Sequence, residues 1–267
     1  ASWDGYVHQV NADGILYRRY PVGEAGVEYP SALDSDPDGA VAIATNKGRL
    51  YLLSPTGNLH SLPSLGGYVR RVRLADLDDD GQPELIAGSH TGDLVVIPAL
   101  SPANLQIGKS ANLHTCPVTD LAFADLDGDG LREVLVACAG PKPGVYAFSA
   151  DGTQRWRYET PAGVWAVAVS DLDGSTEPRP EREEGLTEVN DAWPEVVIGG
   201  DDGTLRVLDH LGRPRGGIAL GGPVHGLRVH DLDGDGQPEI LARTGWQVHA
   251  LTVTPAWEAD MPSPSPP

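Results

Sequence analysis

Short apolar runs alternate along the chain with turns rich in glycine, proline, asparagine and aspartate. The runs are four to seven residues long and rich in Val, Leu, Ile and Tyr. No stretch keeps the 3.6-residue apolar period of an amphipathic helix, so the pattern predicts β-strands and almost no helix.

The runs recur in a fixed order, which makes the chain a series of similar repeats. In each repeat a first run leads into an acidic loop, and a second run, a glycine turn, a third run and a less regular fourth run follow. The first runs are VEYPSAL from Val27, VRRVRLA from Val69, VTDLAFA from Val118, WAVAVS after Val164 and VHGLRVH from Val224. Four strands in a repeat of roughly 45 residues are typical of a β-propeller blade. A β-solenoid or a sandwich with acidic turns is the alternative.

The acidic loops are the most regular part of the repeat. Three are intact nonapeptides: DLDDDGQPE at Asp76 to Glu84, DLDGDGLRE at Asp125 to Glu133 and DLDGDGQPE at Asp231 to Glu239. A fourth, DLDG then DAWPE, is split by an insertion at 175–190, and a shortened fifth, DSDPDG, runs from Asp34 to Gly39. Carboxylates at alternate positions before a glycine can converge on one hard cation, and calcium is the usual occupant.

Within a loop, positions 1, 3, 5 and 9 offer carboxylates, and glycine at position 6 permits the sharp turn that brings them together. An EF-hand would need a glutamate at position 12, where these loops have Ala87, Val136 and Ala242 in apolar runs. We expect three to five Ca²⁺ sites. The expected ligands are Asp76, Asp78, Asp80 and Glu84; Asp125, Asp127, Asp129 and Glu133; Asp171, Asp173, Asp191 and Glu195; Asp231, Asp233, Asp235 and Glu239; and Asp34, Asp36 and Asp38.

Two of the five loops have incomplete or uncertain sets of ligands, and the loops can also be interpreted as turns that bind no metal. The first loop has no glutamate, so its site is expected to be weak or empty. In the split loop Ser175 is the alternative to Asp191 as third ligand. Solvated acidic turns that bind nothing are the alternative for the whole set, but clusters of like charge would then repel one another without return.

Together the repeats resemble the FG-GAP, or VCBS, family, whose members include the propeller of integrin α subunits. The resemblance covers about Trp3 to Val253. It implies an all-β propeller of four-stranded blades with DxDxDG calcium loops, in which ligands approach the face opposite the loops. A weaker similarity to quinoprotein-type propellers lies in DGYVHQVNADG from Asp4 and DGTQRWRYE from Asp151.

We expect one propeller domain over residues 1–254. Third-run segments number six, from GYVHQV at Gly5 to WQVHAL at Trp246, whereas acidic loops number five. Six blades with one incomplete or split between the termini fit best, and five or seven blades are the alternatives. Residues 255–267 are predicted to be a Pro/Ser-rich tail or a linker to further domains.

The negative net charge of the chain limits the partners that it can bind. The net charge is −19, and 16 of the 38 acidic residues are expected ligands in the four fuller loops. Such a charge argues against nucleic acid as a partner. No run of 18 apolar residues occurs, so no membrane insertion is expected. The chain begins with Ala and shows no signal peptide, which fits a processed exported protein or a trimmed chain, and we expect a secreted, cell-surface or periplasmic protein.

The two cysteines, Cys116 and Cys138, flank the Asp125 loop. If the strands on either side form a hairpin, Cys138 faces a residue near Asp120, several positions from Cys116. A disulfide across that offset would be strained, so two buried thiols are predicted.

No catalytic motif stands out, and the eight histidines are scattered. We expect a non-catalytic binding or adhesion module for protein or carbohydrate. A polysaccharide lyase-like enzyme and an architectural or sensor module of a larger protein are the alternatives. The candidate ligand-binding residues follow the repeated Val of each first run: Glu28, Arg70, Thr119, Trp165 and His225. Turns on the same predicted face add Asn46, His90, Asp201 and Trp246. The alternative is that these are unrelated solvated residues.

Overall fold

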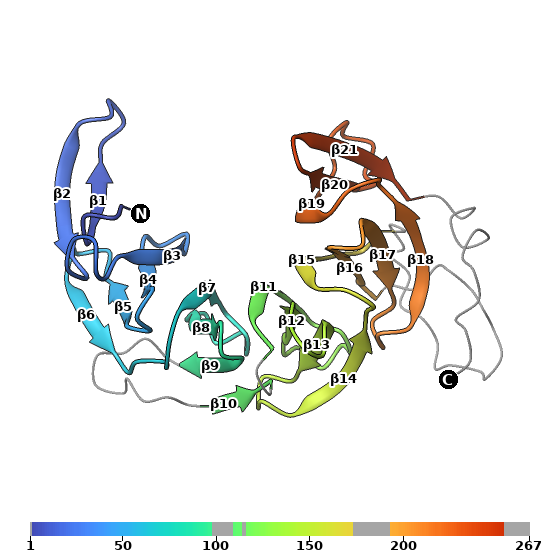
Figure 1. Ribbon diagram of the computed structural model, residues 1–267, viewed down its shortest axis with the longest axis horizontal. Helices are drawn as coiled ribbons and strands as arrows, with labels where there is room; N and C mark the ends of the chain where they lie inside the picture. The colour runs from blue at the N-terminus through green and yellow to red at the C-terminus, as the bar shows by residue number, and fades with distance from the viewer. Residues whose placement is uncertain (1, 98–108, 114–115, 173–192, 254–267) are drawn as a thin grey trace. The chain divides into compact units, whose positions relative to one another are not determined.

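The computed structural model describes residues 2–97, 109–113, 116–172 and 193–253, and the regular structure in these ranges is all β (Figure 1). The insertion at 175–190 and the tail at 255–267 lie outside the described residues. The strands form six antiparallel sheets, of which four have four strands, one has three and one has two. The part of the chain that the structure describes contains no helix that could cross a membrane.

The chain divides into two compact units, Ala1–Leu121 with Ala150–Thr153 and Ala122–Ser149 with Gln154–Pro267. The first unit holds a two-stranded sheet and two four-stranded sheets. The two-stranded sheet is β1 (Tyr6–Val10) and β2 (Leu16–Pro21). The next is β3 (Pro30–Ser35), β4 (Val41–Thr45), β5 (Leu50–Leu53) and β6 (Leu59–Leu62). The third is β7 (Val69–Ala75), β8 (Glu84–Ser89), β9 (Asp93–Ile97) and β10 (Lys109–Asn112).

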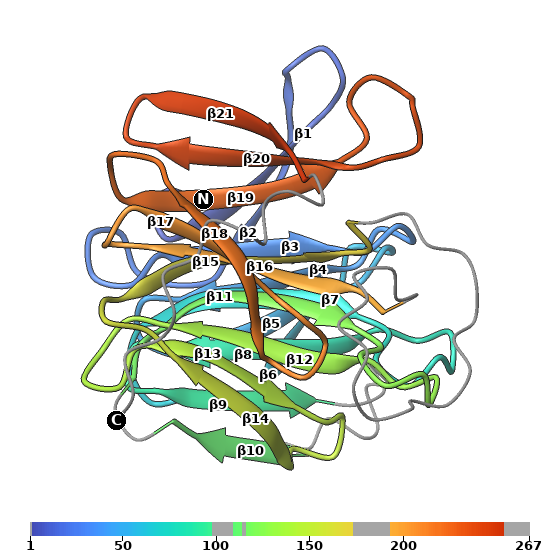
Figure 2. The ribbon, with the colours of Figure 1, turned by 90° about the vertical axis from the view of Figure 1, so that its right-hand side faces the viewer.

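The second unit repeats the same order of strands. One sheet is β11 (Val118–Ala124), which begins in the first unit, β12 (Glu133–Cys138), β13 (Gly144–Phe148) and β14 (Gln154–Glu159). The next is β15 (Val164–Ser170), β16 (Glu195–Gly200), β17 (Thr204–Leu208) and β18 (Pro214–Ala219). The last is β19 (Val224–His230), β20 (Glu239–Thr244) and β21 (Gln247–Thr252), which lie side by side in Figure 2.

Burial explains the predicted pattern of runs. Every residue of β8 and β12 is buried, as is every residue of β13, whereas β14 alternates between exposed and half-buried residues. A continuous apolar run therefore marks a strand covered on both faces, and the less regular fourth run marks a strand that faces solvent. The sheets that fall short of four strands are the first and the last, as the count of third-run segments suggests.

Glycines in the second strands let neighbouring sheets approach closely. A Cβ added to Gly88 of β8 would lie 2.3 Å from Cγ1 of Val118 at the start of β11. A Cβ added to Gly199 of β16 would likewise lie 2.5 Å from Cγ1 of Val224 in β19. Since no real Cβ atom tolerates such distances, these glycines make room for the first valine of the next sheet.

Four first strands, β3, β7, β15 and β19, carry a β-bulge near their start. The register with the second strand shifts between Val69 and Arg71, between Val164 and Ala166, and between Val224 and Gly226. In the sheet of β3 the same shift lies between Pro30 and Ala32, with Ser31 as the extra residue. The alignment of Val27 with Val69 was therefore wrong by three residues, because Pro30 is the structural counterpart of Val69.

The prediction of two free thiols was also wrong. The chain has two cysteines, and both are disulfide-bonded, hence to each other. Cys116 lies outside the strands, two residues before β11, and its N–H donates to the Leu113 carbonyl at 3.3 Å. Strand register does not constrain a residue outside the paired strands, so the offset on which the prediction rested does not apply.

Candidate metal sites

Three acidic loops gather carboxylates in the same way. The loops join β7 to β8, β11 to β12 and β19 to β20, and in each the residues at positions 1, 3 and 9 offer oxygens within 4.8 Å of one another. The three groups are Asp76, Asp78 and Glu84; Asp125, Asp127 and Glu133; and Asp231, Asp233 and Glu239. Each glutamate begins a second strand and is buried, so each group has a fixed base and a more exposed rim.

The buried glutamate also ties its loop together. Its Oε2 accepts the backbone N–H of the leucine at position 2, at 2.8 Å for Leu77 and Glu84, Leu126 and Glu133, and Leu232 and Glu239. The split loop has the same hydrogen bond from Leu172 to Glu195, at 2.9 Å. One oxygen of each carboxylate thus holds the backbone of its own loop.

The aspartate at position 1 orders the glycine turn. Asp231 accepts the N–H of Gly234 at Oδ1 (2.7 Å) and that of Gly236 at Oδ2 (3.0 Å), and Asp125 accepts from Gly128 and Gly130 at the same atoms. The hydrogen bond from Gly234, followed by that from Gly236, lowers the pKa of Asp231 below its usual 3.8. The loop therefore favours the ionised form of this ligand.

The Asp76 loop departs from this arrangement at position 4. Asp79 stands where the other two loops have Gly128 and Gly234, and it takes the left-handed conformation with φ of 58°. Gly81 still donates to Asp76 Oδ2 at 2.9 Å, but Asp76 Oδ1 is buried and has no hydrogen-bond partner in the described structure. A buried carboxylate oxygen without a donor is costly unless a cation satisfies it.

The aspartates at position 5 are not part of the gathered groups. Each accepts the backbone N–H of position 7 at Oδ1: Asp80 from Gln82 at 2.7 Å, Asp129 from Leu131 at 2.8 Å and Asp235 from Gln237 at 2.8 Å. Their role as ligands stays a prediction.

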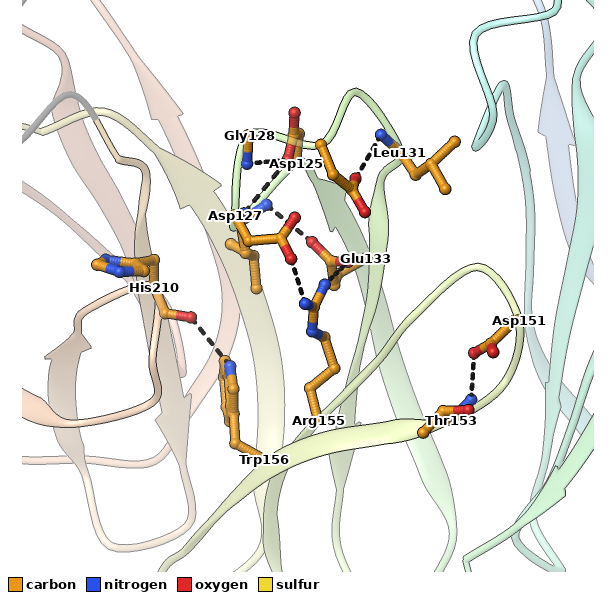
Figure 3. A network of polar contacts seen from close by, with 12 residues as sticks. Asp125, Asp127, Gly128, Leu131, Glu133, Asp151, Thr153, Arg155, Trp156 and His210 are labelled. Carbon is orange, nitrogen blue, oxygen red and sulfur yellow. Dashed lines mark hydrogen bonds and ion pairs between the residues drawn. The ribbon is translucent and has the colours of Figure 1, made fainter. Parts of the chain in front are cut away.

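The Asp125 loop contains a cation of the protein itself. Arg155 of β14 donates from Nη1 to Glu133 Oε1 at 2.6 Å, and its Nη2 contacts Asp127 Oδ2 (Figure 3). Burial raises the pKa of Glu133 above its usual 4.5, although the hydrogen bonds from Leu126 and Arg155 act in the opposite direction. Arg155 was not among the predicted site residues, although the sequence carries a signal for it: Arg155 and Arg215 occupy the same place in two fourth runs.

The two irregular loops differ from the others. In the first, Asp34 accepts the Leu74 N–H at 2.9 Å and lies 3.8 Å from Arg73, and Asp36 accepts the Ala40 N–H at 2.8 Å. These two residues and Asp38 are not among the gathered groups of the described chain. In the split loop Asp173, Asp191 and the alternative ligand Ser175 lie outside the described residues, so only Asp171 and Glu195 are placed.

Three of the five predicted recognition residues are the extra residues of the first-strand bulges: Arg70, Trp165 and His225. In the second unit, the Trp165 and His225 rings lie edge to face with centroids 6.0 Å apart. Trp165 also donates from Nε1 to Asp201 Oδ1 at 2.7 Å, which fixes the orientation of the indole. In the first unit the Arg70 guanidinium lies 6.0 Å from the Tyr68 ring centroid.

The other two predicted recognition residues are buried. Glu28 precedes β3 and is 4% exposed, with Thr45 donating to it at 2.7 Å and Arg49 3.0 Å away. Thr119 is 2% exposed. Ser31, and not Glu28, occupies the bulge of its sheet, and its hydroxyl donates to the Val69 carbonyl at 2.7 Å.

The turns between second and third strands lie beside the entry to the first strand of the same sheet. Asn46 donates its N–H to Tyr29 (3.1 Å), His90 to Tyr68 (2.7 Å) and Asp201 to Gly163 (2.9 Å). The prediction that these turns share an end of the sheet with the bulge residues is therefore confirmed for these three. Trp246, in the corresponding turn of the last sheet, is fully exposed.

The similarity of the chain to known proteins is limited to solved structures. No family model matches the chain, and no curated protein matches it. One similar solved structure is a chain from "Crystal Structure of Mitotic Checkpoint Complex", with 17% identity and a TM-score of 0.64 over 91% of this chain. Two others are from structures of BBS1N in complex with ARL6DN, one soaked with mercury and one with lead, each with 15% identity, TM-scores of 0.56 and 0.59, and 90% of this chain covered.

The match is one of architecture. The chain spans 65% of the length of the mitotic checkpoint chain and 69 to 70% of the BBS1N chains. At such low identity the likeness concerns the fold alone, and it agrees with the repeated four-stranded antiparallel sheets. The chain is an all-β protein with the β-propeller fold, built of four-stranded blades.

Proposed function

We propose that the chain is a calcium-binding β-propeller that acts as a non-catalytic binding or adhesion module for a protein or carbohydrate ligand. Calcium binding is supported by one observation: the same cluster of three carboxylates occurs three times, and in each cluster the ligand oxygens lie within 4.8 Å of one another. The resemblance to FG-GAP repeats supports calcium as the ion.

The donor set fits a hard cation. All three groups offer only carboxylate oxygens, which suit Ca²⁺ or Mg²⁺ rather than a soft metal. The buried Asp76 Oδ1, which has no hydrogen-bond donor among the described residues, is the atom for which a cation would matter most. Since each loop joins the first two strands of a blade, a bound ion would neutralise the carboxylates and hold the strands together.

Thermal unfolding in chelator and in calcium tests the metal. A ligand that binds only the folded state stabilises it by about 2.7 kcal/mol per site at a concentration of 100 Kd. Calcium should therefore raise the melting temperature, and Asp78→Asn, Asp127→Asn and Asp233→Asn should each lower the number of ions bound in calorimetric titration. Melting that ignores both chelator and calcium would refute the proposal.

The bulge residues are the proposed recognition surface. Trp165 offers a large flat ring held by Asp201, next to the exposed His225. Tryptophan is common where binding energy is concentrated, and flat rings also stack on sugars. The similar chains in structures of protein complexes support a protein as the ligand.

Ligand capture tests the surface. A glycan array and a pull-down from extracellular fluid, both with Trp165→Ala beside the wild type, should lose the same bound species in the variant. Tyr17→Ala is the control, because it removes an aromatic ring of β2 that is 75% exposed and lies outside the predicted recognition residues. Equal binding by wild type and Trp165→Ala would exclude this surface.

The disulfide supports a location outside the reducing cytosol. Disulfides persist in secreted, cell-surface and periplasmic proteins. The Cys116–Cys138 bond is thus consistent with the expected export of the chain. Accessible-thiol labelling of the native protein purified from its source tests this, and labelling of both cysteines would contradict it.

A further inference from the structure

Arg155 is placed between two expected metal ligands of the Asp125 loop. Its guanidinium donates to Glu133 Oε1 at 2.6 Å and contacts Asp127 Oδ2 (Figure 3). Glu133 is 1% exposed and uses Oε2 to accept the Leu126 N–H. Arg155 therefore takes the Glu133 oxygen that the backbone leaves available to a cation.

A β-bulge directs Arg155 to this position. In the pairing of β13 with β14, Gln154 faces Phe148 and Trp156 faces Ala147, so Arg155 is the extra residue. A bulge turns the side chain of the extra residue away from the regular alternation of the strand. Here it turns the guanidinium toward the acidic loop of the same sheet.

The neighbouring residue fixes the strand on which Arg155 lies. Trp156 donates from Nε1 to the His210 carbonyl at 2.9 Å, and a Cβ added to Gly212 would lie 2.5 Å from the indole. This packing anchors β14 directly beside the bulge. The position of the guanidinium is thus built into the blade.

The Asp231 loop provides the contrast. Its three gathered residues are the same types at the same positions, but no ion pair of Asp231, Asp233 or Glu239 with a lysine or arginine occurs in the described structure. Among the described residues its sheet has three strands, and none of them corresponds to β14, on which Arg155 lies. The two loops therefore have the same acidic residues, but only the Asp125 loop has an arginine bound to them.

We propose that Arg155 is an internal counter-cation that competes with calcium for the Asp125 loop. A calcium ion must displace the guanidinium from Asp127 and Glu133, which lowers the affinity of this loop relative to the Asp231 loop. Without calcium, the guanidinium neutralises the carboxylates and keeps the blade folded. This inference rests on the proposed calcium binding and concerns the ranking of its sites.

Terbium luminescence can follow this loop. Tb³⁺ replaces calcium at oxygen sites and emits when a nearby tryptophan is excited, and the Trp193 ring lies against Gly128, where an added Cβ would be 2.5 Å from Cη2. The part of the signal that Asp127→Asn abolishes belongs to the Asp125 loop. Titration of that part with Tb³⁺ gives its midpoint.

Arg155→Gln should lower this midpoint by roughly tenfold or more, since hydrogen bonds to charged groups are strong. Arg155→Lys, which keeps the charge but cannot bridge two carboxylates in a fork, should lower it less. Arg157→Gln is the matched control, because Arg157 is two residues along β14 and pairs with Glu159. It should leave the midpoint unchanged.

Thermal unfolding in chelator provides the second readout. Arg155→Gln should melt below Arg157→Gln in chelator, and saturating calcium should close the gap. An unchanged midpoint in Arg155→Gln, with terbium still bound, would overturn this inference and leave calcium binding intact. If no loop binds Tb³⁺ or Ca²⁺ in the wild type, both proposals fail.

Discussion

The Oε2 atom of Glu239 accepts the backbone N–H of Leu232 at 2.8 Å, across the whole length of an acidic loop. The same bond recurs in the loops that end at Glu84, Glu133 and Glu195. The glutamate is therefore both a structural acceptor and an expected metal ligand, and the two roles can be separated by substitution.

Replacement of Glu239 should distinguish these roles. Glu239→Gln keeps an oxygen for the Leu232 N–H but removes the charge, so it should lose the calcium-dependent gain in stability and little else. Glu239→Ala leaves the part-buried Leu232 N–H without its acceptor and should lose about 1 kcal/mol even in chelator. Urea denaturation with and without calcium measures both. Equal losses in chelator would show that the hydrogen bond is unimportant.

Asp79 should be a site of strain. It has φ of 58°, where Gly128 and Gly234 have 74° and 80°, and the left-handed region costs a residue with a Cβ about 1 kcal/mol or more. Asp79→Gly should therefore leave stability in chelator unchanged or raise it by up to about 1 kcal/mol, because the extra freedom of glycine in the unfolded chain offsets part of the gain.

The reverse change provides the control. A Cβ added to Gly234 would meet nothing within 4 Å, so Gly234→Asp adds backbone strain without a clash. It should lower the free energy of unfolding in chelator, in the opposite sense to Asp79→Gly. If both substitutions shift stability in the same direction, backbone conformation is not the cause.

Close packing at Gly199 should not tolerate a methyl group. The added Cβ would lie 2.5 Å from Val224 Cγ1, so Gly199→Ala should destabilise by about 1 to 3 kcal/mol through overpacking. Gly66→Ala is the control, because nothing lies within 4 Å of its added Cβ. Chemical denaturation of both variants measures the difference, and equal stabilities would argue against tight contact between these strands.

Asp202 should contribute a stability that depends on pH. Burial acts to raise its pKa, but hydrogen bonds from Arg206, at 2.5 Å, and from the Thr204 N–H, at 3.0 Å, together hold it below the usual 3.8. A lowered folded-state pKa stabilises the protein above the unfolded-state value, and the gain is lost as pH falls through the folded-state value.

Comparison with Asp202→Asn isolates this group. Near neutral pH the variant should be less stable than the wild type, and the difference in urea midpoint should shrink as the pH falls below about 4. The acidic loops titrate in both proteins, so they cancel in the difference. A gap that stays constant from pH 7 to pH 3 would contradict the expected role of Asp202.

The sequence was sufficient for features that depend on composition and spacing. Continuous apolar runs such as ELIAGS in β8 became buried strands, and DxD spacing brought positions 1 and 3 of three loops to the glutamate at position 9. These features follow from local rules, because alternation and glycine turns act over a few residues. The propeller fold was predicted on the same basis.

Features that depend on a single extra residue were missed. The counterpart of Arg70 is Ser31 and not Glu28, because Pro30 takes the place of the repeated valine at the bulge of β3, and the bulge at Arg155 turned that arginine toward Glu133. Neither bulge changes composition, so nothing in the apolar pattern announces it. The disulfide was missed for a different reason, since Cys116 lies outside the strands and is not subject to strand register.

The first-strand bulges have a consequence for how such a protein can change. Because the extra residue is exempt from strand alternation, the core keeps Val69, Val164 and Val224 while the adjoining position holds arginine, tryptophan or histidine. A substitution at the bulge position changes the side chain that a partner contacts and leaves the packing of the core almost unchanged. The blade thus provides a position at which new specificities can evolve on an unchanged scaffold.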